Sequence, residues 1–131
     1  MRIFFDVDFT LIAGDGSLRP LVKETFQKLK AERHTIYVWS GVGIRWEVVR
    51  QHGLRELIET CFLKPLENHR ENLAKLGVSV LPDFCVDDYQ EIIDAFGGYT
   101  IQPYYVGNQA DREMVRVYEE IQAHINGNRR A

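Results

Sequence analysis

The stretch IFFDVDFTLI, residues Ile3 to Ile12, decides both the fold and the chemistry that this sequence predicts. An apolar run opens it, and Asp6, Asp8 and Thr10 follow at alternate positions. Because successive side chains of an extended segment point to opposite faces, these polar groups are expected to project together where the strand ends. Two such close carboxylates repel each other, and each would cost several kcal/mol if buried without a partner. The pair is therefore expected to open into a cleft and meet a cation, although a hydrated turn capped by Asp8 fits the same stretch.

Size, charge and cysteine content limit the class of protein. The chain has 131 residues, which predicts one domain, residues 1–131, with a hydrophobic core large enough to need no disulfides or structural metal. Its 16 basic and 19 acidic residues give a net charge of −3, which argues against nucleic acid as a partner. No apolar run reaches the length of a membrane span, and the start does not resemble a signal peptide. Cys61 and Cys85 lie in apolar runs, so we expect buried thiols in the reducing cytoplasm.

Hydrophobic periodicity predicts strands that alternate with helices along the whole chain. The expected strands cover residues 3–7, 35–39, 61–63, 84–86 and 100–106. The expected helices cover residues 21–33, 42 or 43 to 52, 68–76, 89–96 and 110 or 111 to 127, with a helical turn over 54–60. Pro103 cannot donate to a ladder, which places the last strand at a sheet edge. Ser17 is expected to cap the first helix and Gly127 to end the last.

This alternation predicts an α/β fold, a three-layer α/β/α Rossmann-like arrangement around a central, parallel five-stranded sheet. Right-handed crossovers put the carboxyl ends of parallel strands along one edge, where such folds bind ligands. Four of the expected strand ends carry polar groups, namely Asp6/Asp8/Thr10, Ser40-Gly41, Lys64 and Asp87-Asp88. The sequence therefore predicts one shared site at this edge.

These four groups, in this order, resemble the four motifs of the haloacid dehalogenase-like (HAD) hydrolase superfamily. DVDFT, residues 6–10, resembles its first motif, Asp-x-Asp-x-Thr, and Ser40-Gly41 resembles the second. Lys64 resembles the third motif, and Asp87-Asp88 resembles the Asp-Asp form of the fourth. The resemblance covers residues 3–88. Phe9 departs from it, because phosphatases of the family very often have Gly there, and this departure bears on substrate preference more than on chemistry.

The resemblance implies a Mg²⁺-dependent phosphomonoester hydrolase that forms an aspartyl-phosphate on Asp6. Asp6 would be the nucleophile, and the Asp8 side chain would protonate the leaving oxygen and then activate water. The implied Mg²⁺ ligands are the Asp6 carboxylate, the main-chain carbonyl of Asp8 and Asp87, an all-oxygen set that suits this ion. Asp88 is expected behind them, orienting Lys64 or a metal-bound water.

Further residues complete the implied site. Ser40 and the Gly41 N–H would donate to phosphoryl oxygens near a helix N-terminus, and Lys64 would offset charge that develops there. Thr10 would order the first loop. Taken alone, Ser40 also suits a helix N-cap, Lys64 a solvated strand end, and Asp87-Asp88 a turn. Their joint occurrence in the family's order favours the site.

The spacing between motifs leaves no room for a cap domain. Only 29 residues separate Thr10 from Ser40, and 23 separate Ser40 from Lys64. By resemblance, a capless member acts on large substrates or is closed by a neighbouring subunit of a homo-oligomer. We expect a small phosphorylated substrate. The alternatives are a phosphatase for a nucleic-acid end or a phosphoprotein, and a non-catalytic Mg²⁺-binding module of the same fold. Dehalogenation is disfavoured, because Lys64 and the paired acids suit a metal and a phosphate.

Overall fold

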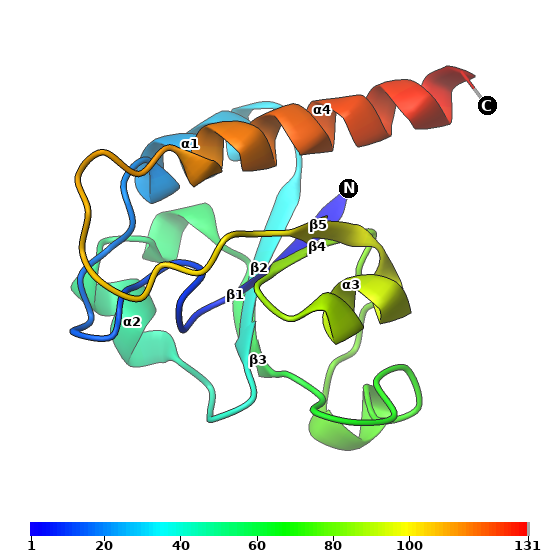
Figure 1. Cartoon of the computed structure of the whole chain (residues 1–131). Coiled ribbons are helices and arrows are strands. Elements are labelled where there is room, and N and C mark those ends of the chain that lie inside the picture. Colours follow the sequence, from blue (N-terminus) through cyan, green and yellow to red (C-terminus); the bar gives the residue numbers. More distant parts are fainter. Residues whose placement is uncertain (131) are drawn as a thin grey trace.

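The computed structural model describes residues 1–130, and a parallel sheet forms its centre. The strands are β1 (Arg2–Asp6), β2 (Thr35–Ser40), β3 (Thr60–Leu63), β4 (Phe84–Asp87) and β5 (Gly98–Thr100). Their order is β3-β2-β1-β4-β5, with every neighbouring pair parallel (Figure 1). This arrangement confirms the predicted α/β fold with a five-stranded parallel sheet, and it places β5 at the edge.

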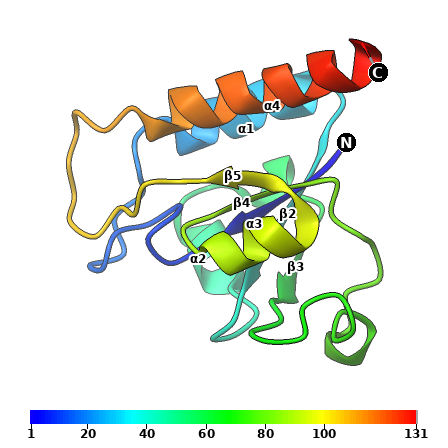
Figure 2. The same ribbon diagram turned by 45° about the vertical axis from the view of Figure 1, so that its right-hand side comes forward.

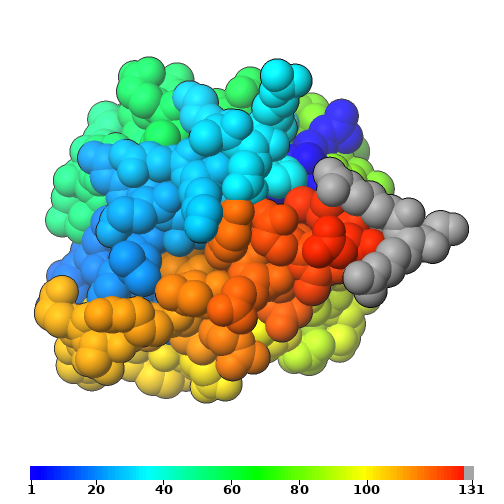
Figure 3. Space-filling model, turned by 90° about the horizontal axis from the view of Figure 1, so that it is seen from above, coloured from blue at the N-terminus to red at the C-terminus, as the bar shows by residue number. Residues whose placement is uncertain are grey.

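Helices cover both faces of this sheet. Those in the described residues are α1 (Val22–Ala31), α2 (Trp46–Gln51), α3 (Gln90–Phe96) and α4 (Glu113–Arg130), with single 3-10 turns at Arg55–Leu57 and Ala74–Leu76. Helices α1 and α4 pack side by side across one face (Figure 3). Helix α3 lies on the opposite face (Figure 2).

Side chains along β1 point alternately to the two faces of the sheet, so they pack against different helices. Ile3 and Phe5 pack with apolar residues of α1, α2 and α4, whereas Phe4 packs on the α3 side. The ring of Phe4 stacks on Tyr37 of β2 with centroids 4.7 Å apart. Both faces of β1 are therefore buried, as its apolar run predicts, and its carboxyl end lies at the centre of the sheet.

The helix predicted over residues 68–76 is wrong, because only the 3-10 turn Ala74–Leu76 forms there. Asn68 has a φ of +45°, outside the helical region. The Asn72 side-chain amide donates to the Glu67 carbonyl at 2.8 Å. Local bonds of this kind compete with helix formation. Leu73 nevertheless packs into the core, as the apolar pattern predicts.

The segment after β2 also departs from its prediction. The sequence predicts a helix from Val42 or Gly43, but α2 begins at Trp46. Gly43 has a φ of +152°, which favours glycine and interrupts a helix. Ser40 Oγ accepts a hydrogen bond from the Val42 N–H at 3.3 Å, so the hydroxyl closes a loop and does not cap a helix. The expected helix N-terminus therefore does not lie beside Ser40-Gly41.

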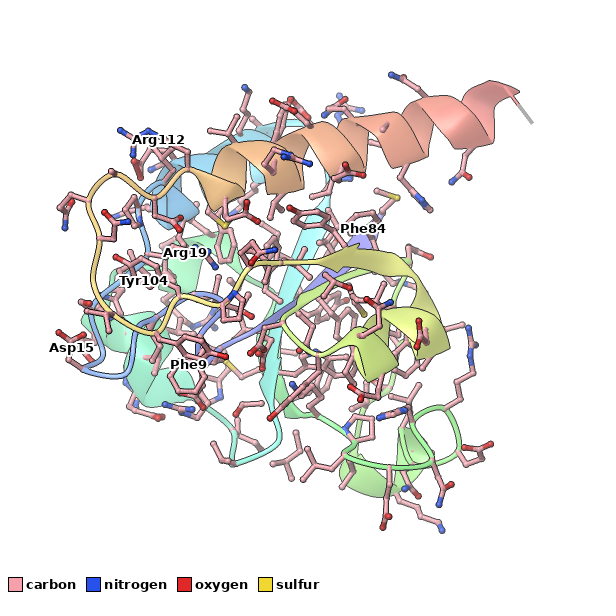
Figure 4. The ribbon with its side chains drawn as sticks, in the orientation of Figure 1. Phe9, Asp15, Arg19, Phe84, Tyr104 and Arg112 are labelled. Carbon is pink, nitrogen blue, oxygen red and sulfur yellow. The ribbon has the colours of Figure 1, made fainter. Side chains whose placement is uncertain are left out.

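The predicted N-cap of α1 and the predicted extent of the last strand were also wrong. Ser17 does not cap α1, because Leu21 holds the N-cap position with a φ of +69° and no side-chain bond. Strand β5 runs from Gly98 to Thr100 and shares only Thr100 with the predicted strand over residues 100–106. The chain beyond it bonds elsewhere, since the Tyr104 N–H donates to the Phe9 carbonyl at 2.7 Å. Figure 4 shows this segment running alongside the loop that follows β1.

Helix α4 buries one apolar side and leaves the rest polar. Met114, Val117 and Ile121 are fully buried against the core. The helix continues through Gly127 to Arg130, so Gly127 does not end it as predicted. Among residues 1–130, no helix combines the length and apolar character needed to cross a bilayer.

Candidate functional site

An ionic cluster lies at the edge of the sheet where β1, β3 and β4 have their carboxyl ends. Asp6 ends β1, Asp87 ends β4, and Lys64 directly follows β3. Lys64 Nζ donates to Asp6 Oδ1 at 2.9 Å and to Asp87 Oδ2 at 3.0 Å. All three side chains are buried. The structure thus brings together residues that lie far apart in the sequence, as the strand-end argument predicts.

Burial makes this cluster an unfavourable place for two carboxylates. Desolvation raises the pKa of Asp6 to about 6 and outweighs the attraction of Lys64. Desolvation also raises the pKa of Asp87 to about 6, and the charge of Asp6 acts in the same direction. Burial alone would lower the pKa of Lys64, but the two carboxylates outweigh it and raise that pKa. One lysine does not neutralise the acids, so a divalent cation would stabilise the cluster.

Asp88 is the acid whose surroundings best fit a metal. Single carboxylate oxygens of Asp6, Asp87 and Asp88 lie within 4.8 Å of one another. Asp88 Oδ1 is buried and has no hydrogen-bond partner among the residues that the structure describes. A buried oxygen without a donor is costly, and a cation would satisfy it. The oxygen-only set fits Mg²⁺ in its chemistry and its spacing.

Asp87 and Asp88 differ in burial and in access to the cavity. Asp87 is fully buried and does not line the cavity; its Oδ1 accepts the Tyr89 N–H at 2.9 Å and its Oδ2 accepts Lys64. Asp88 lines the cavity in front of Asp6. The geometry therefore favours Asp88 as the acid that faces a ligand, and Asp87 as the acid that positions Lys64.

The loop after β1 folds tightly around Asp6. Thr10 Oγ1 donates to Asp6 Oδ2 at 3.1 Å, so the hydroxyl orders this carboxylate. Phe9 has a φ of +64°, a left-handed conformation that glycine adopts most easily. Its ring meets Tyr105 edge-on, with centroids 5.1 Å apart, and this contact favours an aromatic residue at position 9.

A buried arginine, missed by the sequence analysis, holds this loop in place. Arg19 Nη1 donates to the Thr10 carbonyl at 3.1 Å. Its Nε and Nη2 bind the two oxygens of Asp111 at 2.9 and 3.0 Å, and Nη2 also donates to the Gln102 carbonyl at 2.6 Å. Figure 4 shows Arg19 close to Tyr104 of the segment after β5. Only the apolar residues that flank this arginine in the sequence signal its burial.

Asp8 lies at the mouth of the site, where its side chain is 40% exposed. Arg45 Nη1 donates to Asp8 Oδ2 at 2.7 Å, and Arg45 Nε donates to Glu47 Oε1 at 2.7 Å. No motif pointed to Arg45, because it belongs to the loop that replaces the predicted start of a helix. Asp8 thus differs from the buried Asp6 in both partner and exposure, which suits two carboxylates with two roles.

The cluster opens into a cavity of about 320 Å³. Its wall includes Asp6, Asp8, Ser40, Gly41, Lys64 and Asp88. Thr10 and Asp87 are fully buried behind this wall. Every residue that the sequence analysis selected therefore lies in the cavity wall or bonds directly to a residue in it.

The fold and this site together define an α/β protein with a lysine-bridged acidic cluster at the carboxyl edge of a parallel sheet. Neither a scan against models of known protein families nor a search of curated proteins gave a significant match. The chemistry of the site is therefore argued from its own residues.

Proposed function

We propose that this chain is a Mg²⁺-dependent phosphomonoester hydrolase that works through an aspartyl-phosphate on Asp6, as the resemblance to HAD hydrolases implies. The observation that carries the proposal is the convergence of Asp6, Asp88 and Lys64 on one cavity from three separate strand ends. Attack of a carboxylate on a phosphate brings two anions together, so a positive charge must lie beside each of them. Acid oxygens for a cation and a buried lysine for the phosphoryl group meet that requirement.

Asp6, Asp88 and the main-chain carbonyl of Asp8 would hold the Mg²⁺, with Asp87 behind them positioning Lys64. When bound, the ion reduces the repulsion between Asp6 and the phosphate. Asp6 attacks phosphorus, and the bond from phosphorus to the leaving oxygen breaks as Asp8 gives that oxygen a proton. Asp8 then takes a proton from the water that hydrolyses the aspartyl-phosphate. Arg45 fixes the position of the Asp8 carboxylate at the cavity mouth through a 2.7 Å ion pair.

Three groups are proposed to bind the phosphoryl oxygens. The Ser40 hydroxyl retains its hydrogen for donation, because the bond to Val42 uses the hydroxyl oxygen as acceptor. The Gly41 N–H and Lys64 lie in the same cavity wall. Without a helix N-terminus beside Ser40, the phosphate depends chiefly on these groups and the cation.

The test is hydrolysis of 4-nitrophenyl phosphate with and without Mg²⁺. We expect turnover to require Mg²⁺ and to fall by orders of magnitude in Asp6→Asn, which keeps the shape but removes the nucleophile. Asp94→Asn, on the exposed side of α3, is the matched control and should keep full activity. Equal rates in wild type and Asp6→Asn would overturn the catalytic proposal.

The alternatives predict different results. A non-catalytic module would gain thermal stability from Mg²⁺ without any turnover. A phosphatase for macromolecules would cleave phosphopeptides or nucleic-acid ends far better than small esters. We favour a small substrate, because a cavity of about 320 Å³ lies in the range of small-molecule sites.

We place the protein in the reducing cytoplasm, where the free thiols of Cys61 and Cys85 persist. Sedimentation tests whether a second subunit closes the open site.

A further inference from the structure

We propose that the leaving group of the substrate lies in a second hollow beside the phosphate cavity. We infer that this hollow selects phosphate esters of a flat, mainly apolar ring that carries a hydrogen-bond donor on its far side. The inference rests on the proposed function, because the phosphate site anchors the ester. The hollow has a volume of about 380 Å³, enough for one small molecule.

The two hollows adjoin each other. Lys64, Leu66 and Tyr89 line both of them. Lys64 Nζ lies 5.6 Å from the centroid of the Tyr89 ring, so this ring borders the cation that would hold the phosphoryl group. An ester whose phosphate faces Asp6 can therefore extend its organic part between Leu66 and Tyr89.

The walls next to the phosphate cavity are apolar and uncovered. Leu66 is 69% exposed and Tyr89 is 60% exposed, although both are large hydrophobic side chains. Covering them with an apolar group removes that surface from water. An aromatic ring gains more than an aliphatic chain there, because it can also stack on Tyr89.

The far wall of the hollow is polar. The Glu91 carboxylate lines it and accepts hydrogen bonds without donating any. His69 lines it too, and its ring is packed edge-on against Phe96 with centroids 6.4 Å apart. A ring substituent that donates a hydrogen bond or carries a positive charge would pair with Glu91.

Binding of phosphonates, which no phosphatase cleaves, tests this inference separately from turnover. We expect phenylphosphonate to bind the wild-type protein in Mg²⁺ roughly tenfold more tightly than methylphosphonate. Tyr89→Ala should remove that preference. Tyr118→Ala should keep it, because Tyr118 lies on α4 and lines neither hollow.

Glu91→Ala and its control Glu67→Ala test the polar wall of the hollow. 4-(Aminomethyl)phenylphosphonate should bind more tightly than phenylphosphonate, and Glu91→Ala should abolish this gain. Glu67→Ala should not, because Glu67 lines a neighbouring hollow instead. Equal binding of the methyl and phenyl compounds, or a phenyl preference that survives Tyr89→Ala, would overturn the inference and leave the phosphate site intact. Binding of neither compound would overturn the proposed function as well.

Discussion

Phe9 combines an unfavourable backbone conformation with a favourable contact. Its φ of +64° costs an L-residue about 1 kcal/mol or more, and its ring packs on Tyr105. The resemblance to HAD phosphatases already marks this position as one where glycine is common. The structure supplies the reason, since the turn around Asp6 needs a left-handed residue here.

Phe9→Gly is expected to be more stable than Phe9→Ala by about 1 kcal/mol, the reverse of the usual order of these residues in regular structure. Both variants lose the ring, but only glycine relieves the backbone. Urea unfolding of the two variants measures the difference. Ala123→Gly in the exposed part of α4 is the control and should be destabilising. A more stable Phe9→Ala would show that the turn is not strained.

Asp87→Asn is expected to stabilise the metal-free protein at neutral pH. The folded-state pKa of Asp87 is about 6, above the ordinary value of about 3.9, so the folded state binds this proton more tightly than the unfolded state. The ionised carboxylate therefore lowers stability progressively as the pH rises from about 4 to 6. Asparagine does not titrate, so its advantage should grow from near zero at pH 4 to about 2 kcal/mol at pH 7.

Urea unfolding in chelator at several pH values measures this advantage, with Asp94→Asn as the control for loss of one exposed negative charge. A variant less stable than the wild type at pH 7 would mean that the ion pair with Lys64 outweighs the burial of Asp87.

At the scale of elements, the buried Arg19 joins two loops that the sequence does not connect. It binds the loop after β1 through Thr10, and the segment after β5 through Gln102 and Asp111. The loop that positions Asp6 is thereby tied to residues about 90 positions later, since Arg19 and Asp111 lie 92 apart. These bonds hold residues 102–111 in a loop, where the sequence predicts a strand over residues 100–106.

Arg19→Met is expected to cost about 3–5 kcal/mol, because it leaves Asp111 partly buried without its cation. Thermal unfolding measures the loss. Arg112→Ala should cost little, because Arg112 is exposed and bonds only to nearby carbonyls. A small effect of Arg19→Met would mean that the two loops pack without this ion pair.

Four of the five strands and most helices were predictable because their apolar periods are regular. Tyr37, Val38 and Trp39 mark a buried strand wherever it lies in the fold. The failures occur at Gly43 and Asn68, whose positive φ values depend on local contacts that no periodicity records. The contacts of Arg45 with Asp8 were unpredictable for the same reason. The meeting of Asp6 with Lys64 was predictable, since it needs only the topology of parallel strands.

At the scale of the whole molecule, the two cysteines are buried in the sheet and can serve as probes of its unfolding. Cys61 lies on β3 and Cys85 on β4, with β2 and β1 between them. Strands lie about 4.8 Å apart, so the two residues are about 14 Å apart and cannot form a disulfide. Burial raises the pKa of Cys61 to about 11 and raises the pKa of Cys85 further.

Neither thiol is therefore expected to react with a thiol reagent in the native protein at pH 8, because reaction requires the thiolate and access to it. Labelling of Cys85 should follow global unfolding, and its urea dependence should match that of circular dichroism. Rapid labelling of Cys85 under native conditions would contradict the sheet core described above. A Cys61→Ala variant isolates the signal from Cys85.

The position of β1 between β2 and β4 has a consequence for biosynthesis. Ile3 pairs with Phe84, 81 positions later. At ordinary translation rates that gap lasts about 4 to 16 s. Until β4 has been made, β1 is an apolar segment that ends in Asp6 and has no strand partner on its β4 side. Such a nascent chain is a natural client for chaperones, and its acidic cluster can form only once Asp87 and Asp88 have emerged.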